Sequence, residues 1–100
     1  MKVLAKFYWD CGRSGVIDGL FIAEKSKIES AYGKYVYLGE VLGKHSEIYG
    51  GLDEGDITII SEDPVVIETL SNLFEDGTIS GFNPLEYIQE DEETEDDEVD

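Results

Sequence analysis

The chain has 100 residues, with 24 Asp or Glu against seven Lys or Arg, so its formal net charge is −17. Hydrophobic residues make up 41% of it, which is enough for one folded core, and it lacks the long apolar run of a membrane span or a signal peptide. The single cysteine, Cys11, cannot form an internal disulfide, and we expect a cytoplasmic protein.

The first two predicted elements form an antiparallel hairpin. Apolar and polar residues alternate over residues 2–9, which is typical of a strand. The glycine-containing segment 11–15 predicts a turn, and residues 16–23 form a second apolar run of strand length. A short helix follows, with Ser26 and Glu29 as a capping box and Gly33 at its end.

Three more strands are predicted along the middle of the chain. They cover residues 34–42, 47–52 and 57–60, where β-branched and aromatic residues are frequent. Gly50 and Gly51 weaken the second of these strands and suggest a bulge within it.

The helix that begins near residue 64 has the clearest boundaries. Asp63 can cap it, Pro64 suits its first position, and Gly77 follows as a stop. Its apolar face would consist of Val66, Ile67, Leu70, Leu73 and Phe74. Residues 78–82 then form a last strand or extended segment, and residues 83–87 form one helical turn that packs Leu85, Tyr87 and Ile88 on the body.

These elements predict an α+β fold, in which a mostly antiparallel sheet of about five strands carries two helices on one face in the order ββαβββα. Residues 1–89 would form a single domain. After Gln89 Val99 is the one apolar residue, so we expect residues 90–100 to be a disordered acidic tail.

The charges are distributed unevenly along the chain. Residues 1–44 hold all seven bases and five acids, whereas residues 45–100 hold nineteen acids and no base. Nine of the eleven residues in 90–100 are acidic. Direct binding of nucleic acid or of an anionic membrane is disfavoured, because phosphate contacts need Lys or Arg.

An acidic binding face is the first candidate site. Its carboxylates could enter a basic groove, either by electrostatic attraction alone or in place of nucleic-acid phosphates. Solubility alone is the simpler explanation for such charge. The residues of this face are Glu62, Asp63, Glu68, Glu75, Asp76, Glu86, Glu90, Asp91, Glu92 and Glu93.

An aromatic sheet face is the alternative site. Tyr8, Tyr35, Tyr37 and Tyr49 all fall on predicted strands, and the two on the third strand share a face. If no helix covers that face, the tyrosines would anchor a protein–protein interface, with the acidic tail only a solubiliser. The opposing interpretation is that each tyrosine belongs to the core.

Catalysis and metal binding have weaker support. Cys11 and His45 could form a nucleophile–base pair, with Arg13 lowering the pKa of the thiol, but no spacing specifies an orienting residue. The turn at 10–15 lacks the spacing of a phosphate-binding loop. The acids at 53, 54 and 56 lack the EF-hand order, so we expect a solvated turn and no metal or cofactor.

Two segments, KFYWDCGRSGVIDGLFIA and YLGEVLGKHSEIYG, resemble segments of small acidic proteins encoded by tailed bacteriophages. The resemblance implies a non-enzymatic inhibitor in the host cytoplasm, in some cases a DNA mimic. Its partner would be a basic host protein: a nuclease, a restriction or other defence complex, or RNA polymerase. No residue role can be transferred from this resemblance.

Overall fold

The computed structural model describes residues 1–43, 47–74 and 77–89. Their strands are β1 (Lys2–Asp10), β2 (Val16–Glu24), β3 (Tyr35–Gly39), β4 (Ile48–Gly51), β5 (Ile57–Ser61) and β6 (Thr78–Gly81). The α-helices are α1 (Lys25–Ala31) and α2 (Pro64–Leu73), and the short 3-10 turns are η1 (Gly12–Ser14), η2 (Glu54–Asp56) and η3 (Pro84–Tyr87). The predicted α+β class is confirmed, while the predicted tail at 90–100 lies outside the described residues.

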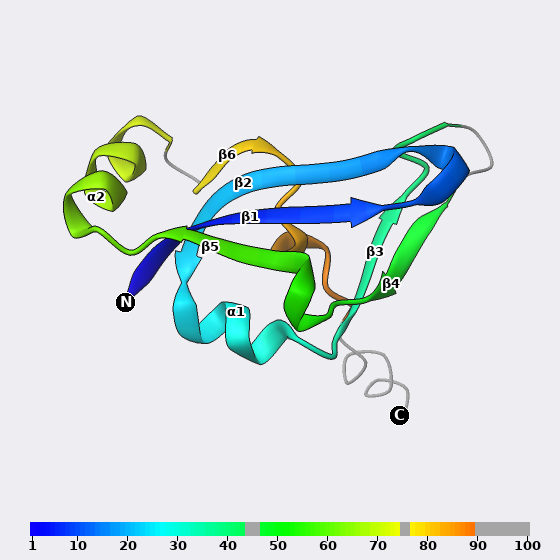
Figure 1. Cartoon of the computed structure of the whole chain (residues 1–100), viewed down its shortest axis with the longest axis horizontal. Coiled ribbons are helices and arrows are strands. Elements are labelled where there is room, and N and C mark those ends of the chain that lie inside the picture. The colour runs from blue at the N-terminus through cyan, green and yellow to red at the C-terminus, as the bar shows by residue number, and fades with distance from the viewer. Residues whose placement is uncertain (44–46, 75–76, 90–100) are drawn as a thin grey trace, which may run out of the picture.

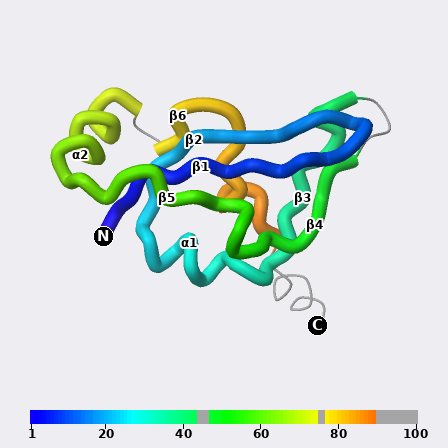
Figure 2. Tube along the Cα trace, viewed as in Figure 1, coloured from blue at the N-terminus to red at the C-terminus, as the bar shows by residue number. Residues whose placement is uncertain are grey.

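The six strands form two separate antiparallel sheets (Figure 1). The larger has the order β5-β1-β2-β6, and the smaller pairs β3 with β4. Figure 2 shows the β3–β4 hairpin at the opposite end of the molecule from α2. The expected single sheet is therefore divided in two, and β6 gives the described chain a sixth strand.

The β1–β2 hairpin is the longest pairing, running without a register shift from Lys2↔Glu24 to Asp10↔Val16. One face of β1 places Val3, Ala5 and Phe7 in the main core, where all three are fully buried. Other elements complete this core, chiefly through Phe21 of β2, Ile28 of α1, Val36 and Leu38 of β3, and Ile48 of β4.

The other face of the same hairpin carries a smaller cluster, in which Leu4 and Ile22 pack against Ile67 of α2. The two α-helices therefore cover opposite faces of the large sheet, and the prediction of one helical face is wrong. The reason is that β1 and β2 contain apolar residues on both faces near the open end of the hairpin.

The apolar face predicted for α2 is only partly confirmed. Ile67 is buried and Leu70 is partly buried, but Leu73 keeps 68% of its surface exposed. Of this predicted face, only Ile67 and Leu70 belong to the cluster with Leu4 and Ile22, so the end of α2 does not pack on the sheet there.

The two helix starts differ in how well sequence predicts them. Asp63 caps α2 as expected, because its Oδ1 accepts a hydrogen bond of 3.0 Å from the Val65 amide. The capping box predicted for α1 is wrong, because the helix already begins at Lys25 and Ser26 lies inside it. The Glu24 N-cap makes no side-chain hydrogen bond to the helix amides.

The predicted bulge also lies elsewhere. The register of β3 and β4 shifts between Tyr37 and Gly39, opposite Tyr49 and Ile48, so the extra residue is on β3 and not at Gly50 or Gly51. Strand β3 ends at Gly39, earlier than predicted, and this glycine adopts a left-handed φ of 83°.

The segment after β6 packs on the body as predicted. Leu85, Tyr87 and Ile88 contact the main core, and Ile88 forms an isolated bridge with Val36. Asn83 is buried and caps η3 by accepting a hydrogen bond from the Leu85 amide.

We expect Gly19→Ala to lower the free energy of unfolding by about 3 kcal/mol. A Cβ on Gly19 would lie 1.9 Å from the Phe82 carbonyl oxygen, so β2 and the chain beyond β6 would have to separate. Gly55→Ala is the matched control, because its Cβ would meet no atom within 4 Å. Urea unfolding of both variants measures the effect, and equal midpoints would contradict the close approach.

Candidate functional site

Three tyrosines form an exposed face on the small sheet. In β3 the buried Val36 and Leu38 alternate with the exposed Tyr35 and Tyr37. Tyr37 lies directly opposite Tyr49 of β4, so these side chains project from the same face. We call Tyr35, Tyr37 and Tyr49 the tyrosine face.

The rings of the tyrosine face contact one another yet remain open to solvent. The ring centroids are 5.9 Å apart for Tyr35 and Tyr49 and 6.3 Å apart for Tyr37 and Tyr49. Their exposed fractions are 44% for Tyr35, 37% for Tyr37 and 55% for Tyr49. Gly51, opposite Tyr35, leaves open space beside them, because a Cβ there would meet no atom within 4 Å. No described helix covers these rings.

The inner side of the hairpin is supported by the large sheet. Trp9 of β1 lies under Gly50, where a Cβ would come within 3.8 Å of the indole ring. Trp9 in turn packs on Phe7, with ring centroids 5.2 Å apart. The tyrosine face therefore rests on a packed aromatic layer, which keeps the rings in place before any partner arrives.

Tyr8 does not belong to this face. It projects from β1 on the side opposite Phe7 and Trp9, which point into the main core beneath β3 and β4. The structure thus brings together three of the four tyrosines considered from sequence, and Tyr8 lies separately with 48% of its surface exposed.

Carboxylates border the tyrosine face at the Tyr37 end. The pKa of Tyr37 is raised by loss of hydration, then by a hydrogen bond to Glu47 and by the negative charges of Glu47 and Glu40. Both glutamates are exposed. The site therefore combines aromatic rings with negative charge.

The acidic residues proposed from sequence are distributed differently. Glu62 forms an ion pair of 3.3 Å with Lys25, and Asp63 caps α2. Glu86 lies on η3, which contacts β3, and its Oε2 accepts a hydrogen bond from the Thr78 hydroxyl. Three of the four described members thus already have partners within the chain. The remaining members, Glu75, Asp76, Glu90, Asp91, Glu92 and Glu93, lie outside the described residues.

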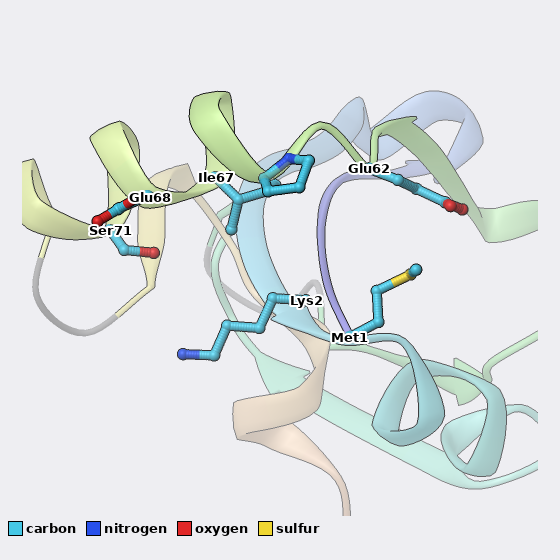
Figure 3. A pocket seen from close by; sticks show the side chains of 7 residues that line it. Met1, Lys2, Glu62, Ile67, Glu68 and Ser71 are labelled. Carbon is cyan, nitrogen blue, oxygen red and sulfur yellow. The ribbon is translucent and has the colours of Figure 1, made fainter.

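Glu62 and Glu68 also line a hollow of about 440 Å3 between the start of β1 and α2 (Figure 3). Figure 3 shows Ile67 of α2 pointing into it and Lys2 on the far side. Because Lys2 shares the lining with these two glutamates, the hollow is mixed in charge and does not present a continuous acidic surface.

The proposed Cys11–His45 pair gains no support. The pKa of the Cys11 thiol is raised by burial and by the charge of Asp10, so the expectation that Arg13 lowers it is wrong. Asp10 Oδ1 also accepts a hydrogen bond of 3.0 Å from the Gly12 amide, and this bond stabilises the turn between β1 and β2. His45 lies outside the described residues.

The acids after β4 form a turn, as expected. Asp53 and Asp56 make a reciprocal capping box around η2. Within residues 1–43, 47–74 and 77–89, no group of three or more potential ligands could hold a metal ion. Neither described α-helix has the length and apolar character needed to cross a membrane.

Comparison of the chain with protein-family models, curated proteins and solved structures gives no match.

The sequence patterns did not identify three residues at the edge of the tyrosine face: Glu40, Glu47 and Gly51. A signal for the two glutamates exists, because a hairpin brings the end of one strand beside the start of the next. Residues 40 and 47 flank such a connection between the tyrosine-bearing strands. The open space at Gly51 depends on the register and could not be inferred from composition.

We expect Glu47→Gln to lower the pKa of Tyr37 toward the ordinary phenol value. A raised pKa in the folded state means that Tyr37 contributes stability below the ordinary value of about 10, and that this contribution is lost as the pH rises through the folded-state pKa. An alkaline NMR titration of the ring carbons measures the change. Glu68→Gln is the control and should leave the Tyr37 curve unmoved; an unchanged curve in Glu47→Gln would contradict the contact.

Asp63 should behave as a structural cap. Asp63→Ala should lower the free energy of unfolding by about 1 kcal/mol, while Asp63→Asn, which also caps well, should cost far less. Thermal unfolding followed by circular dichroism compares the two. If both variants lose equal stability, the charge of Asp63 matters more than its hydrogen bond to Val65.

Proposed function

We propose that this chain is a non-enzymatic binding protein whose tyrosine face engages a basic surface of a partner protein. The observation that carries the proposal is the exposed cluster of Tyr35, Tyr37 and Tyr49, bordered by Glu40 and Glu47. Exposed tyrosines supply large contact areas at low entropic cost and are enriched among the residues that dominate binding energy.

The acidic border specifies the chemistry of the partner. Lys and Arg side chains are attracted to the faces of tyrosine rings as well as to carboxylates. The net charge of −17 would speed the approach of a cationic surface and repel an anionic one. The cation–π contribution is about 0.5–1 kcal/mol for each exposed contact, so several contacts are needed for stable binding.

The resemblance to small acidic phage proteins implies a class of partner. That class is a host nuclease, a restriction or other defence complex, or RNA polymerase. A DNA mimic would need an array of free carboxylates. Because Glu62, Asp63 and Glu86 are engaged within the chain, the tyrosine face has better support than an array on α2.

The test compares Tyr49→Ser with Tyr8→Ser. Tagged wild-type protein first captures partners from bacterial lysate at low salt, and the purified partner is then titrated against each variant. We expect Tyr49→Ser to weaken binding about tenfold, since Tyr49 contacts both other rings, and Tyr8→Ser to leave binding unchanged.

Salt provides the second arm of this test. Binding to a basic surface should weaken as the ionic strength rises, because screening reduces the attraction between exposed charges. Equal affinity at low and high salt would remove the electrostatic part of the proposal. Equal affinity of Tyr49→Ser and wild type would remove the tyrosine face.

A further inference from the structure

The two edges of the small sheet differ in how far they are covered. Along β3, Ile88 forms a bridge with Val36. Next to it, the Gln89 amide donates a hydrogen bond of 2.8 Å to the Tyr35 carbonyl oxygen. In the part of the chain that the structure describes, β4 pairs with β3 alone, so its other side is an open edge (Figure 1).

The alternation of the ladder determines which backbone groups of β4 point outward. Opposed residues of antiparallel strands either exchange both hydrogen bonds or turn both backbone groups away. The Tyr35 carbonyl points away from β4, toward Gln89, so the opposed Gly51 turns its N–H and C=O to the open edge. Tyr49, two residues earlier in β4, does the same. Both residues are exposed, and beyond the β3–β4 ladder no described segment bonds to their backbone groups.

The edges of the large sheet are less regular than this one. The register leaves Ile60 of β5 without a residue opposite it on β1, and Ile79 of β6 without one on β2. Such bulges twist an edge strand away from regular pairing. In the small sheet the extra residue is on β3, so β4 is regular from Tyr49 to Gly51. Strand β4 is therefore the best template for another extended chain.

A strand added at this edge would share its side-chain alternation with β4. A residue that exchanges both hydrogen bonds with Tyr49 or Gly51 projects its side chain on the tyrosine face. Opposite Tyr49 it would lie beside that ring, and opposite Gly51 it would enter the open space near Tyr35. The residue between these two, opposite Gly50, would face the side on which Trp9 lies.

Carboxylates flank the open edge at both ends. Glu47 directly precedes β4, and Asp53 and Glu54 lie shortly after it. All three residues are exposed, and Glu47 is hydrogen-bonded to Tyr37 on the tyrosine face. An added strand would thus meet negative charge at each end, which favours a cationic segment.

Two lysines lie at the covered edge instead. Lys27 and Lys34 line a groove of about 320 Å3 together with Leu85 and Ile88. Ile88 is the residue that bridges β3 at that edge. The positive charge of these lysines is therefore separated from the open edge by the width of the small sheet.

We propose that the partner of the tyrosine face presents an extended segment that pairs antiparallel with β4 and alternates Lys or Arg with apolar residues. The pairing rests on the proposed function, since it takes the tyrosine face as the binding surface. The cationic side chains would lie opposite Tyr49 and Gly51, against the tyrosine rings, and the apolar ones would face the Trp9 side. Backbone hydrogen bonds would supply affinity, and the alternating side chains would supply specificity.

Peptides methylated on backbone nitrogens test this pairing. The probe is a short blocked peptide that alternates arginine and valine, titrated into the full chain. Methylation of the arginine nitrogens blocks the amides that would face β4, and it should weaken binding at least about tenfold. Methylation of the valine nitrogens, which would face solvent, is the matched control and should preserve the affinity. Binding of the unmethylated peptide should also slow hydrogen exchange of the Tyr49 and Gly51 amides.

Gly51→Pro tests the same contact from the protein side. Proline removes the Gly51 N–H, which points to the open edge and makes no bond to β3. We expect the unmethylated peptide to bind this variant about fivefold more weakly. Gly51→Ala is the control, because it keeps the N–H and its Cβ meets no atom within 4 Å. Urea unfolding checks that both variants fold, and the methylated peptides decide the question if Gly51→Pro does not.

Equal affinity of the two methylated peptides, a greater loss from the valine set, or no binding of the unmethylated peptide would overturn the pairing with β4. The partner protein captured from lysate separates this failure from that of the proposed function. A partner that binds Tyr49→Ser weakly but Gly51→Pro as tightly as wild type retains the tyrosine face and overturns the strand pairing. A partner that binds both variants as tightly as wild type overturns both.

Discussion

The uninterrupted pairing of β1 with β2 is the constraint on which the rest of the structure depends. Each strand contributes nine residues, and the alternation of side chains along them sends two apolar sets to opposite faces. One set, with Phe7 and Phe21, forms the main core, and the other, with Leu4 and Ile22, receives α2. A slip of one residue would exchange the two faces and leave both clusters without their partners.

The tyrosine face is a consequence of that arrangement. The main core buries one side of the β3–β4 hairpin through Val36, Leu38 and Ile48, and the alternation of the strands then obliges the tyrosines to face solvent. A two-stranded sheet is only marginally stable by itself. Here the support of Trp9 beneath Gly50 compensates, so a surface rich in aromatic rings is held by packing on its hidden side.

Charge in this molecule has two different roles, which net charge alone cannot separate. Some carboxylates serve the fold: Asp63 caps α2, Asp53 and Asp56 form a capping box, and Glu62 pairs with Lys25. Others, such as Glu40 and Glu47, border exposed rings. The first group is engaged in holding the fold, so a partner would gain little from it. In the second group Glu47 is hydrogen-bonded to Tyr37, but this pair belongs to the exposed face itself, so its charge adds to the surface that a partner would meet.

The sequence by itself determined the local features: the α+β class, the β1–β2 hairpin, the Asp63 cap of α2, and the shared face of Tyr35 and Tyr37. Each of these follows from period-two alternation or from hydrogen bonding between residues two or three apart, which a single segment can specify. Tertiary structure decided that the sheet divides in two, that α1 and α2 lie on opposite faces, that Tyr8 is separate from the other tyrosines, and that Lys27 and Lys34 meet Ile88 in one groove. These features depend on which distant segments pack on each face of the β1–β2 hairpin. A local sequence pattern cannot specify this, because it does not show which distant segment will be the packing partner.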